Sequence, residues 1–433
     1  MAELVGAVLS EFDYFKPSAT QTMVVEEYDE PIGVASPVTR IDQSVMFEIP
    51  AQDGVYRDLN NSYMVLKVKV TKSDGSALTA GTDAVAPTNL LLSSLFKTFE
   101  VKLNGTLVSH ANALHAYRAY IETLLTYNEA VLNTRGALEG WSKDDAAVMD
   151  GIAFSSAGVN AGFVARNKWI SGANTVLTLV GRPHADIFHQ DLDIPAGVSI
   201  SLKFIPNDVK FALQAANGAT FKLEPVEQRF YVRSKKLSPE AVAAHKEMCA
   251  HFGGYRLPIT KVIMNMHDVS GAAKEIGSLV PGDNVPSRIV IGLASTTAIN
   301  GALAENPLNF KPHGLTNLQV VAGGESYPRE ALQMNFATGD YEQAYINTLG
   351  AIGLDTGNRA LAIAPTEWAA GYNLHAFKLQ PGPLEHACFS QAKTGSCKAN
   401  LTFASAVTGI QLIVYAEIPG LVHISETGKV TLV

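Results

Sequence analysis

The sequence predicts an all-β protein built as two consecutive β-sandwiches with a few inserted helices. Most apolar residues recur with period two in short runs, and Gly, Pro and Asn separate these runs. This pattern is typical of half-buried strands joined by turns. The chain has 433 residues, of which 47% are hydrophobic, so it is long enough to bury more than one core.

Charged residues make up only 17% of the chain, whereas ordinary globular proteins contain about 25%. Because the cores of protein interfaces are depleted of charge, we expect other chains to cover part of the surface. The net charge is -8 and the isoelectric point is near 5.8. A net negative charge argues against a protein that binds the phosphate groups of nucleic acids, and we expect no sequence-specific nucleic-acid binding.

The sequence has no features of a secretory signal, since it begins Met1-Ala-Glu3 without a basic segment or a sustained apolar run. No stretch reaches the roughly 18 apolar residues of a membrane helix. Cys249, Cys388 and Cys397 are an odd number without a Cys-x-x-Cys motif. We therefore expect a reducing compartment and cysteines that act as small core residues.

Residues 1–40 are expected to form an acidic N-terminal arm, because they show no sustained apolar period. Their net charge is -5, from seven acids and two bases: Glu3, Glu11, Asp13, Glu26, Glu27, Asp29 and Glu30 against Lys16 and Arg40. This charge makes attachment to DNA unfavourable and favours a protein partner.

Residues 41–237 are expected to form the first sandwich. Apolar and polar residues alternate over 61–70, 99–103 and 198–204. Asn104-Gly105 follows the second of these runs and supplies the positive φ angles of a tight hairpin turn.

Two helices interrupt the strands. Apolar residues recur at helical spacing over 114–125, with Arg118 and Glu122 on the opposite face, which predicts an amphipathic helix. A second helix is expected from Ser238, a capping residue followed by Pro239, to about residue 250. Together with the glycines that follow, it defines a linker over 238–254.

Residues 255–433 are expected to form the second sandwich with a C-terminal extension. The last predicted strand is apolar on both faces, so it should be buried on both. The strand candidates are 259–268, 287–294, 316–322, 372–379, 400–404 and 409–417.

Many of these segments closely resemble the double jelly-roll capsid proteins of adintovirus-like and Polinton-like elements. The similarity runs in the same order through about residues 43–430, and only 141–171 and 337–364 match poorly. The segments that carry it are 61–70, 95–105, 117–127, 181–190, 288–293, 300–301, 306–311, 371–378 and 414–417.

The resemblance implies a major capsid protein of a double-stranded DNA virus or virus-like element. Each protomer would stand two jelly rolls side by side in a homotrimer of pseudo-hexagonal outline. Such trimers would tile an icosahedral virion shell after assembly inside the host cell. Neighbouring capsomers, a single jelly-roll protein at the vertices and minor capsid or cement proteins are the expected partners, and an internal membrane is left open.

Two sets of residues resemble a chemical site. Ser94-Leu-Phe-Lys97 and Lys393-Thr-Gly395 match two elements of serine β-lactamases, but Lys97 leads into a strand and no Ser-Asp-Asn is present. His184 and His189 are five residues apart, which suits neither a helical pair nor one face of a strand, although other donors are near: Asp186, Asp191 and Asp193. We therefore predict no catalytic, metal or cofactor-binding residues and no enzyme.

Two further functions are compatible with a β-sandwich. A carbohydrate-binding module would need a platform of exposed tryptophans, but Trp141, Trp169 and Trp368 lie far apart in sequence. A cupin-like enzyme would need a set of His and Glu metal ligands, which the sequence does not reveal. A stable trimer in solution would favour the capsid hypothesis over both.

Overall fold

The computed structural model describes residues 20–110, 112–155, 158–172, 175–355, 360–380 and 393–432. The first 19 residues of the expected arm and Cys388 lie outside these ranges. Cys249 and Cys397 are both buried with free thiols, as expected for small core residues.

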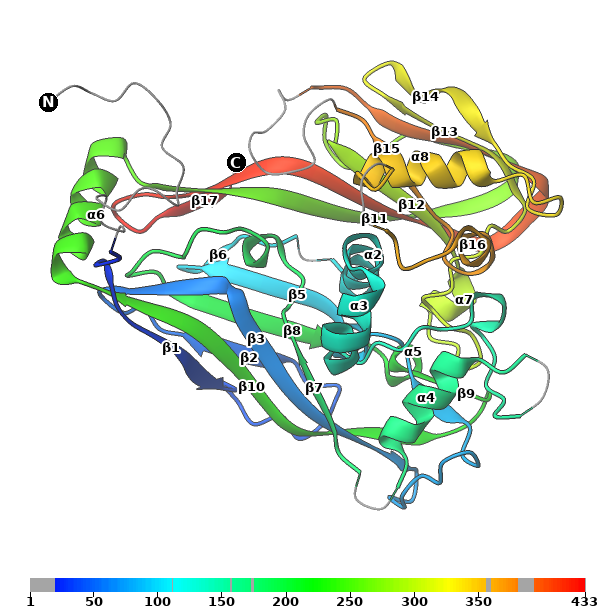
Figure 1. The fold of residues 1–433 in the computed structure, drawn as a ribbon, viewed down its shortest axis with the longest axis horizontal. Coiled ribbons are helices and arrows are strands. Elements are labelled where there is room, and N and C mark those ends of the chain that lie inside the picture. Colours follow the sequence, from blue (N-terminus) through cyan, green and yellow to red (C-terminus); the bar gives the residue numbers. More distant parts are fainter. Residues whose placement is uncertain are drawn as a thin grey trace, which may run out of the picture.

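The first half contains two four-stranded antiparallel sheets packed face to face. We call them the outer sheet and the inner sheet, because the inner sheet lies between the outer sheet and the long strands of the second half (Figure 1). The outer sheet has the order β1 (Val24–Gly33), β10 (Phe221–Leu237), β3 (Val55–Lys72) and β7 (Leu177–Gly181). The inner sheet has the order β2 (Val45–Ile49), β8 (Ile200–Pro206), β5 (Phe96–Leu103) and β6 (Thr106–Leu107).

Alternating side chains of both sheets form the first core. Phe99 and Phe204 stack within the inner sheet with ring centroids 4.2 Å apart, and Phe47 meets Phe230 of the outer sheet at 5.8 Å. The period-two pattern of the sequence therefore places its apolar face between the sheets. A short ribbon of β4 (Val85–Pro87) and β9 (Leu213–Ala215) closes one end.

The second half is organised by one seven-stranded sheet. Its path is β14 (Glu325–Gln333), β13 (Leu315–Ala322), β16 (Cys397–Ile424), β12 (Arg288–Ser295) and β15 (Leu374–Lys378). Strands β11 (Tyr255–Ile276) and β17 (Val430–Leu432) pair with β16. The two segments predicted as separate strands over 400–404 and 409–417 are parts of the single strand β16.

The long strands β11 and β16 contribute to both cores. Leu257 and Ile259 of β11 and Val422 of β16 belong to the core of the first half. Ile263 and Val414, farther along the same strands, belong to the core of the second half. The two halves therefore share strands.

The predicted helices over 114–125 and from Ser238 are confirmed as α2 (His115–Thr126) and α6 (Pro239–Phe252). The Ser238 side chain accepts a hydrogen bond from the backbone N–H of Ala241, and Gly253 ends the helix with φ of 72°. Helix α6 joins β10 to β11 at one end of the molecule (Figure 1).

Further helices occur where the sequence shows no clear period. None of the described helices is long and apolar enough to span a bilayer. They are α1 (Leu91–Ser94), α3 (Glu129–Val131), α4 (Ala161–Ile170), α5 (Val209–Ala212), α7 (Thr296–Ile299), α8 (Glu342–Ile352) and α9 (Pro365–Ala370).

Part of the segment expected to be an arm is a regular strand. Val24–Gly33 forms β1, which pairs antiparallel with β10 at the edge of the outer sheet. The expectation of an irregular segment is wrong here because β1 forms a backbone ladder with β10, packs Val24 and Ile32 against buried clusters and makes cross-strand ion pairs. Asp29 lies 2.7 Å from Arg233 of β10, and Glu30 pairs with Arg57 of β3. The apolar contacts of β1 are too few to appear as a sustained period in the sequence.

Candidate functional site: a buried charge cluster between the two halves

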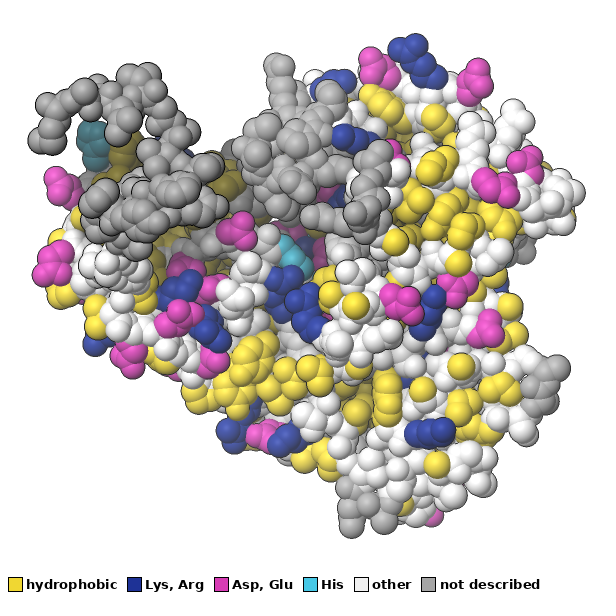
Figure 2. Space-filling model, viewed as in Figure 1, with side chains coloured by type: hydrophobic (Ala, Val, Ile, Leu, Met, Phe, Trp, Pro, Cys, Tyr) yellow, Lys and Arg dark blue, Asp and Glu magenta, His cyan; other side chains and the backbone are white. Residues whose placement is uncertain are grey.

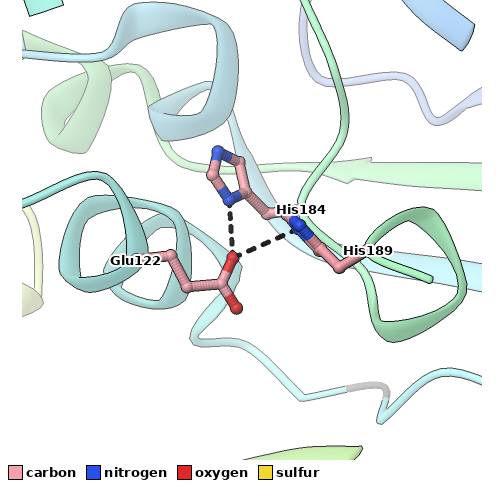
Figure 3. Close-up of side chains that lie close together, drawn as sticks. All are labelled: Glu122, His184 and His189. Atoms are coloured by element: carbon pink, nitrogen blue, oxygen red, sulfur yellow. Dashed lines mark hydrogen bonds and ion pairs between the residues drawn. The ribbon is translucent and has the colours of Figure 1, made fainter. Parts of the chain in front are cut away.

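Five polar side chains converge where the two halves meet. Helix α2 contributes Arg118 and Glu122, and the segment before β8 contributes His184, Asp186 and His189; Figure 3 shows Glu122 with the two histidines. Arg118 and Glu122 were predicted on the face of this helix opposite its apolar residues, and the structure buries that face too, since they are only 6% and 9% exposed. Side chains of the segment before β8 cover the polar face of α2, and they pair with Arg118 and Glu122.

The Glu122 carboxylate is the centre of the charge cluster. One oxygen accepts a hydrogen bond from Nε of Arg118 at 2.8 Å. The other accepts from Nδ1 of His184 at 2.6 Å and lies 3.5 Å from Nε2 of His189. Burial acts to raise the pKa of Glu122, but Arg118 and the two histidines hold it well below its usual range. Glu122 is therefore ionised and satisfied.

Arg118 also connects Glu122 to the second half. Its Nη2 lies 2.7 Å from Oδ1 of Asp186, and the same oxygen accepts a hydrogen bond from the backbone N–H of Val262 in β11 at 3.2 Å. Burial raises the pKa of Asp186, although Arg118 opposes this. Its Oδ2 is buried and has no hydrogen-bond partner among the described residues.

Strands β12 and β16 extend the cluster on its other side. The Tyr415 hydroxyl lies 3.5 Å from Oε1 of Glu122 and donates to Oε1 of Glu417 at 2.9 Å. Nε of Arg288 donates to the remaining oxygen of Glu417 at 3.0 Å. The cluster thus runs from α2 in the first half to two strands of the second, and it ties the halves together by charge-assisted hydrogen bonds.

Glu122, His184 and His189 are ligand types for zinc, and their ligand atoms lie within 4.8 Å of one another. Nη2 of Arg182 lies 3.2 Å from Nδ1 of His189. Arginine can only donate, so Nδ1 of His189 accepts and Nε2 carries the proton. Nδ1 of His184 likewise carries the proton that it donates to Glu122. In the structure these atoms hydrogen-bond to one another and to arginines as an ion-pair network, and a metal ion bound here would have to displace those hydrogen bonds and protons.

The five donors weighed in the sequence do not stay together. His184, Asp186 and His189 join the charge cluster, whereas Asp193 pairs with Lys235 of the outer sheet at 3.0 Å. Asp191 lies 3.5 Å from Nδ2 of Asn60. The partner that sequence reasoning missed is Glu122, which is distant in sequence and was assigned only to the polar face of a helix.

A cavity of ≈ 10 Å³ adjoins the cluster and is lined by His110, His115 and His184. This volume holds about one water molecule and no organic substrate. Burial lowers the pKa of His115 to about 3, and it also lowers the pKa of His189 to about 3, against the opposing charge of Glu122. Both rings are therefore neutral.

The residues that resemble a serine β-lactamase are not assembled as a catalytic site. The Ser94 hydroxyl is buried and donates to the backbone carbonyl of Asn89 at 2.7 Å. Lys97 is exposed on β5, and Lys393 lies beside Glu325 of β14 in the second half. Ser94 thus holds a turn in place.

A second buried ion pair lies within 141–171, a segment that matches the resembling capsid proteins poorly. Its arginine also anchors this segment to β4. Arg166 of α4, which is fully buried, lies 2.7 Å from Oδ1 of Asp144 and donates to the carbonyl of Pro87 at 2.7 Å. The Tyr372 hydroxyl of the second half donates to the backbone carbonyl of Asp144 at 2.9 Å. This second contact again bridges the halves.

Comparisons with known proteins identify which structures share this fold. No family model matches the chain. An uncharacterized protein of Caenorhabditis elegans is 22% identical over 382 residues, which cover 84% of this chain and 86% of that protein.

Several solved structures match nearly the whole chain, and two of them illustrate the likeness. A chain of the Sputnik virophage structure has a TM-score of 0.62 and 11% identity, covering 100% of this chain and 93% of that chain. The Faustovirus major capsid protein has a TM-score of 0.57 and 10% identity, covering 97% of this chain and 93% of that chain. The predicted fold class is confirmed: the chain has the double jelly-roll fold seen in viral major capsid proteins.

Proposed function

We propose that this chain is a major capsid protein of a double-stranded DNA virus or of a related integrated element. The observation that supports the proposal is the likeness of the whole chain, through both jelly rolls, to structures of viral capsid proteins. A low proportion of charged residues, 17% of the chain, is consistent with a surface that other subunits cover.

The finer proposal is a pseudo-hexameric homotrimer that tiles the facets of an icosahedral virion. Its partners would be neighbouring capsomers, a vertex protein and minor capsid proteins, with assembly inside the host cell. The segments resembling adintovirus-like and Polinton-like capsid proteins suggest that group. In this proposal 1–40 is the N-terminal part, 41–237 and 255–433 are the jelly rolls and 238–254 links them.

A structural role without catalysis is part of the proposal. Its support is that the polar groups closest to a reactive arrangement, Glu122, His184 and His189, are engaged with one another and with arginines. The adjoining cavity of ≈ 10 Å³ leaves no room for a substrate beside them.

The test is the mass of the purified protein, followed by electron microscopy of concentrated samples. Three chains of 46.2 kDa give 138.6 kDa, and a stable interface of the proposed kind should keep this mass on dilution to nanomolar concentration. We expect light scattering to report the trimer and micrographs to show closed shells or facets. A monomer at micromolar concentration would contradict the proposed function.

A further inference from the structure

Histidines are concentrated where the two halves meet. Four of the 11 histidines of the chain lie in the charge cluster or beside it: His110, His115, His184 and His189. The first three line the cavity of ≈ 10 Å³ together with Arg118, and Val262 and Met264 of β11 line it too. Side chains that can gain a positive charge near pH 6.5 are therefore gathered at the contact between the first half and β11.

Hydrogen bonds from two segments join the surroundings of the cavity to the backbone of β11. Oδ1 of Asp186 accepts from the N–H of Val262 at 3.2 Å, and Nδ2 of Asn112 donates to the carbonyl of Met264 at 2.6 Å. The same Oδ1 of Asp186 lies 2.7 Å from Nη2 of Arg118 in α2. Because one carboxylate oxygen serves both partners, the contact with β11 depends on the charge balance around Arg118.

A proton on His115 would have no free carboxylate beside it among the described residues. The His115 ring is buried and meets the Phe99 ring of β5 edge to face, with centroids 5.7 Å apart. The titratable groups that face it are His184, Arg118 and Glu122, and the side chains of β11 that line the cavity are apolar. Glu122 already accepts from Arg118 and His184. Protonation would thus add a buried positive charge next to an arginine, which is costly.

His110 and His189 are also surrounded by more bases than acids. The charged groups that face these two rings are Arg118, Arg182 and Lys261 against Asp186 and Glu122. Burial lowers the pKa of both rings, and the acids only oppose this effect. The side chain of His189 is 31% exposed, so protons from solvent reach the cluster. Figure 2 shows a histidine at the surface near the centre of the view, with basic side chains beside it.

We propose that this contact is acid-sensitive: on mild acidification its histidines take up protons, and α2 and the segment 182–190 separate from β11 while the strands of both cores stay paired. The proposal goes beyond the capsid function and does not depend on it, because it rests on contacts within one chain. Strands β11 and β16 belong to both cores, so the opening is local. The junction then has a closed state near neutral pH and an open state in acid.

The direction of the pH effect follows from the difference between the two states. The pKa of His115 is about 3 in the closed state, whereas an exposed histidine titrates near about 6.5. The open state therefore binds protons that the closed state refuses. Each such histidine raises the open fraction about eightfold between pH 7 and pH 5.5. The raised pKa values of Asp186 and Glu139 oppose the opening, because the closed state binds their protons first. Opening should begin below pH 6.5 and level off where these carboxyls titrate.

Oxidation of methionines by hydrogen peroxide measures the opening in the unmodified protein. Met264 lines the cavity and is 4% exposed, so it should react only when the contact opens. We expect its oxidation rate to rise at least about tenfold from pH 7 to pH 5.5, since His110 and His189 act together with His115. Peptide mass spectrometry compares this rate with those of three reference methionines: Met248, which is 55% exposed and reports the reactivity of the reagent, and Met64 and Met334, which are buried in the two cores and report global unfolding.

A variant with a matched control identifies the group that titrates. His115→Gln removes one titrating ring, so the rise at Met264 should become about eightfold smaller. His375→Gln is the control, because His375 is equally buried but packs against Trp368 in the second core and does not line the cavity. It should leave the rise unchanged. Circular dichroism verifies folding, and His115→Phe, which keeps an aromatic ring against Phe99, replaces the glutamine variant if that variant is unfolded.

The outcomes decide the proposal without reference to the capsid function. A rise at Met264 alone, reduced by the His115 substitution and kept in His375→Gln, supports the acid-sensitive contact. A rate at Met264 that does not change with pH contradicts it, and so does a rise that Met64 and Met334 share, since the whole chain then unfolds. A rise that the His115 variants keep in full also overturns it, because other groups then open the contact.

Discussion

Glu122 holds the negative charge on which the buried cluster depends. Glu122→Gln keeps the shape of the side chain but leaves Arg118 and His184 facing an amide in a buried site. Breaking a buried ion pair from one side costs about 3 to 5 kcal/mol, because the remaining charge loses its partner. We expect the free energy of unfolding in urea to fall by that amount.

Glu227→Gln is the matched control for this substitution. Glu227 pairs with Lys67 at 2.6 Å, but both side chains are about one-third exposed. A surface pair contributes less than about 1 kcal/mol. Equal losses for the two variants would show that the Glu122 cluster does not stabilise the junction.

Buried neutral histidines predict a loss of stability in mild acid. Burial lowers the pKa of His115 and of His375 to about 3. Since these values lie below the ordinary value of about 6.5, the unfolded chain binds protons that the native chain refuses, and stability falls as the pH drops below about 6.5. Each histidine should remove roughly 2 kcal/mol between pH 6.5 and 5. The raised pKa values of Glu139 and Asp186 have the opposite effect on stability. As the pH falls, these carboxyls bind protons in the folded chain before they do so in the unfolded chain, which stabilises the folded state.

The measurement is thermal unfolding from pH 7 to pH 5. His375→Gln should reduce the acid-induced loss of stability by roughly 2 kcal/mol, whatever its effect at pH 7. An unchanged pH dependence in this variant would contradict the assignment of a neutral His375.

The sequence identified the structural role of a single residue only where that role depends on residues close by in the chain. The sequence predicted that Ser238 caps a helix and that Asn104 lies in a turn, and the structure confirms both predictions. The burial of Arg118 and Glu122 was not predicted because helical periodicity separates polar from apolar faces but does not show what covers the polar face. Their partners, Asp186 and His184, come from a segment more than 60 residues away.

At the scale of the element, α6 depends on its first turn. Ser238→Ala removes the hydrogen bond from the backbone N–H of Ala241, which has a length of 3.3 Å. We expect the free energy of unfolding to fall by about 1 kcal/mol, whereas Ser238→Asp, which keeps an acceptor at the cap, should change it little. Chemical denaturation checks both, and identical losses would argue that the cap does not stabilise α6.

Strands in which apolar and polar residues alternate could be predicted from the sequence. Elements stabilised chiefly by ion pairs or backbone hydrogen bonds could not. The run over 61–70 lies in β3 and that over 198–204 overlaps β8, because one face of each is buried in a core. Strand β1 was missed since only Val24 and Ile32 pack against the cores, and the rest of the strand is held by its backbone ladder with β10 and by ion pairs. Helix α4 was missed because its buried residues include Arg166 and Asn167, whose polarity hides the burial.

At the scale of the whole molecule, two truncations separate fold from assembly. Removing residues 1–19 leaves β1 intact, so we expect an unchanged trimer and, if the segment binds neighbouring capsid proteins, fewer closed shells. Removing residues 1–35 also deletes β1 and exposes the edge of β10, which should lower the thermal midpoint and promote aggregation. Light scattering, thermal unfolding and micrographs measure these effects. Equal shell yields from the shorter truncation and the full chain would show that residues 1–19 have no part in assembly.

The strands that the two halves share constrain how such a gene can evolve. Leu257 and Ile259 of β11, with Val422 and Ile424 of β16, complete the core of the first half although they are encoded after α6. A recombination event that joins a foreign second jelly roll at α6 therefore replaces part of the first core as well. Duplication, loss or exchange of one jelly roll alone would leave apolar residues without partners. The two rolls are thus inherited as a single unit, and we expect sequence change in the shared strands to be correlated across the α6 boundary.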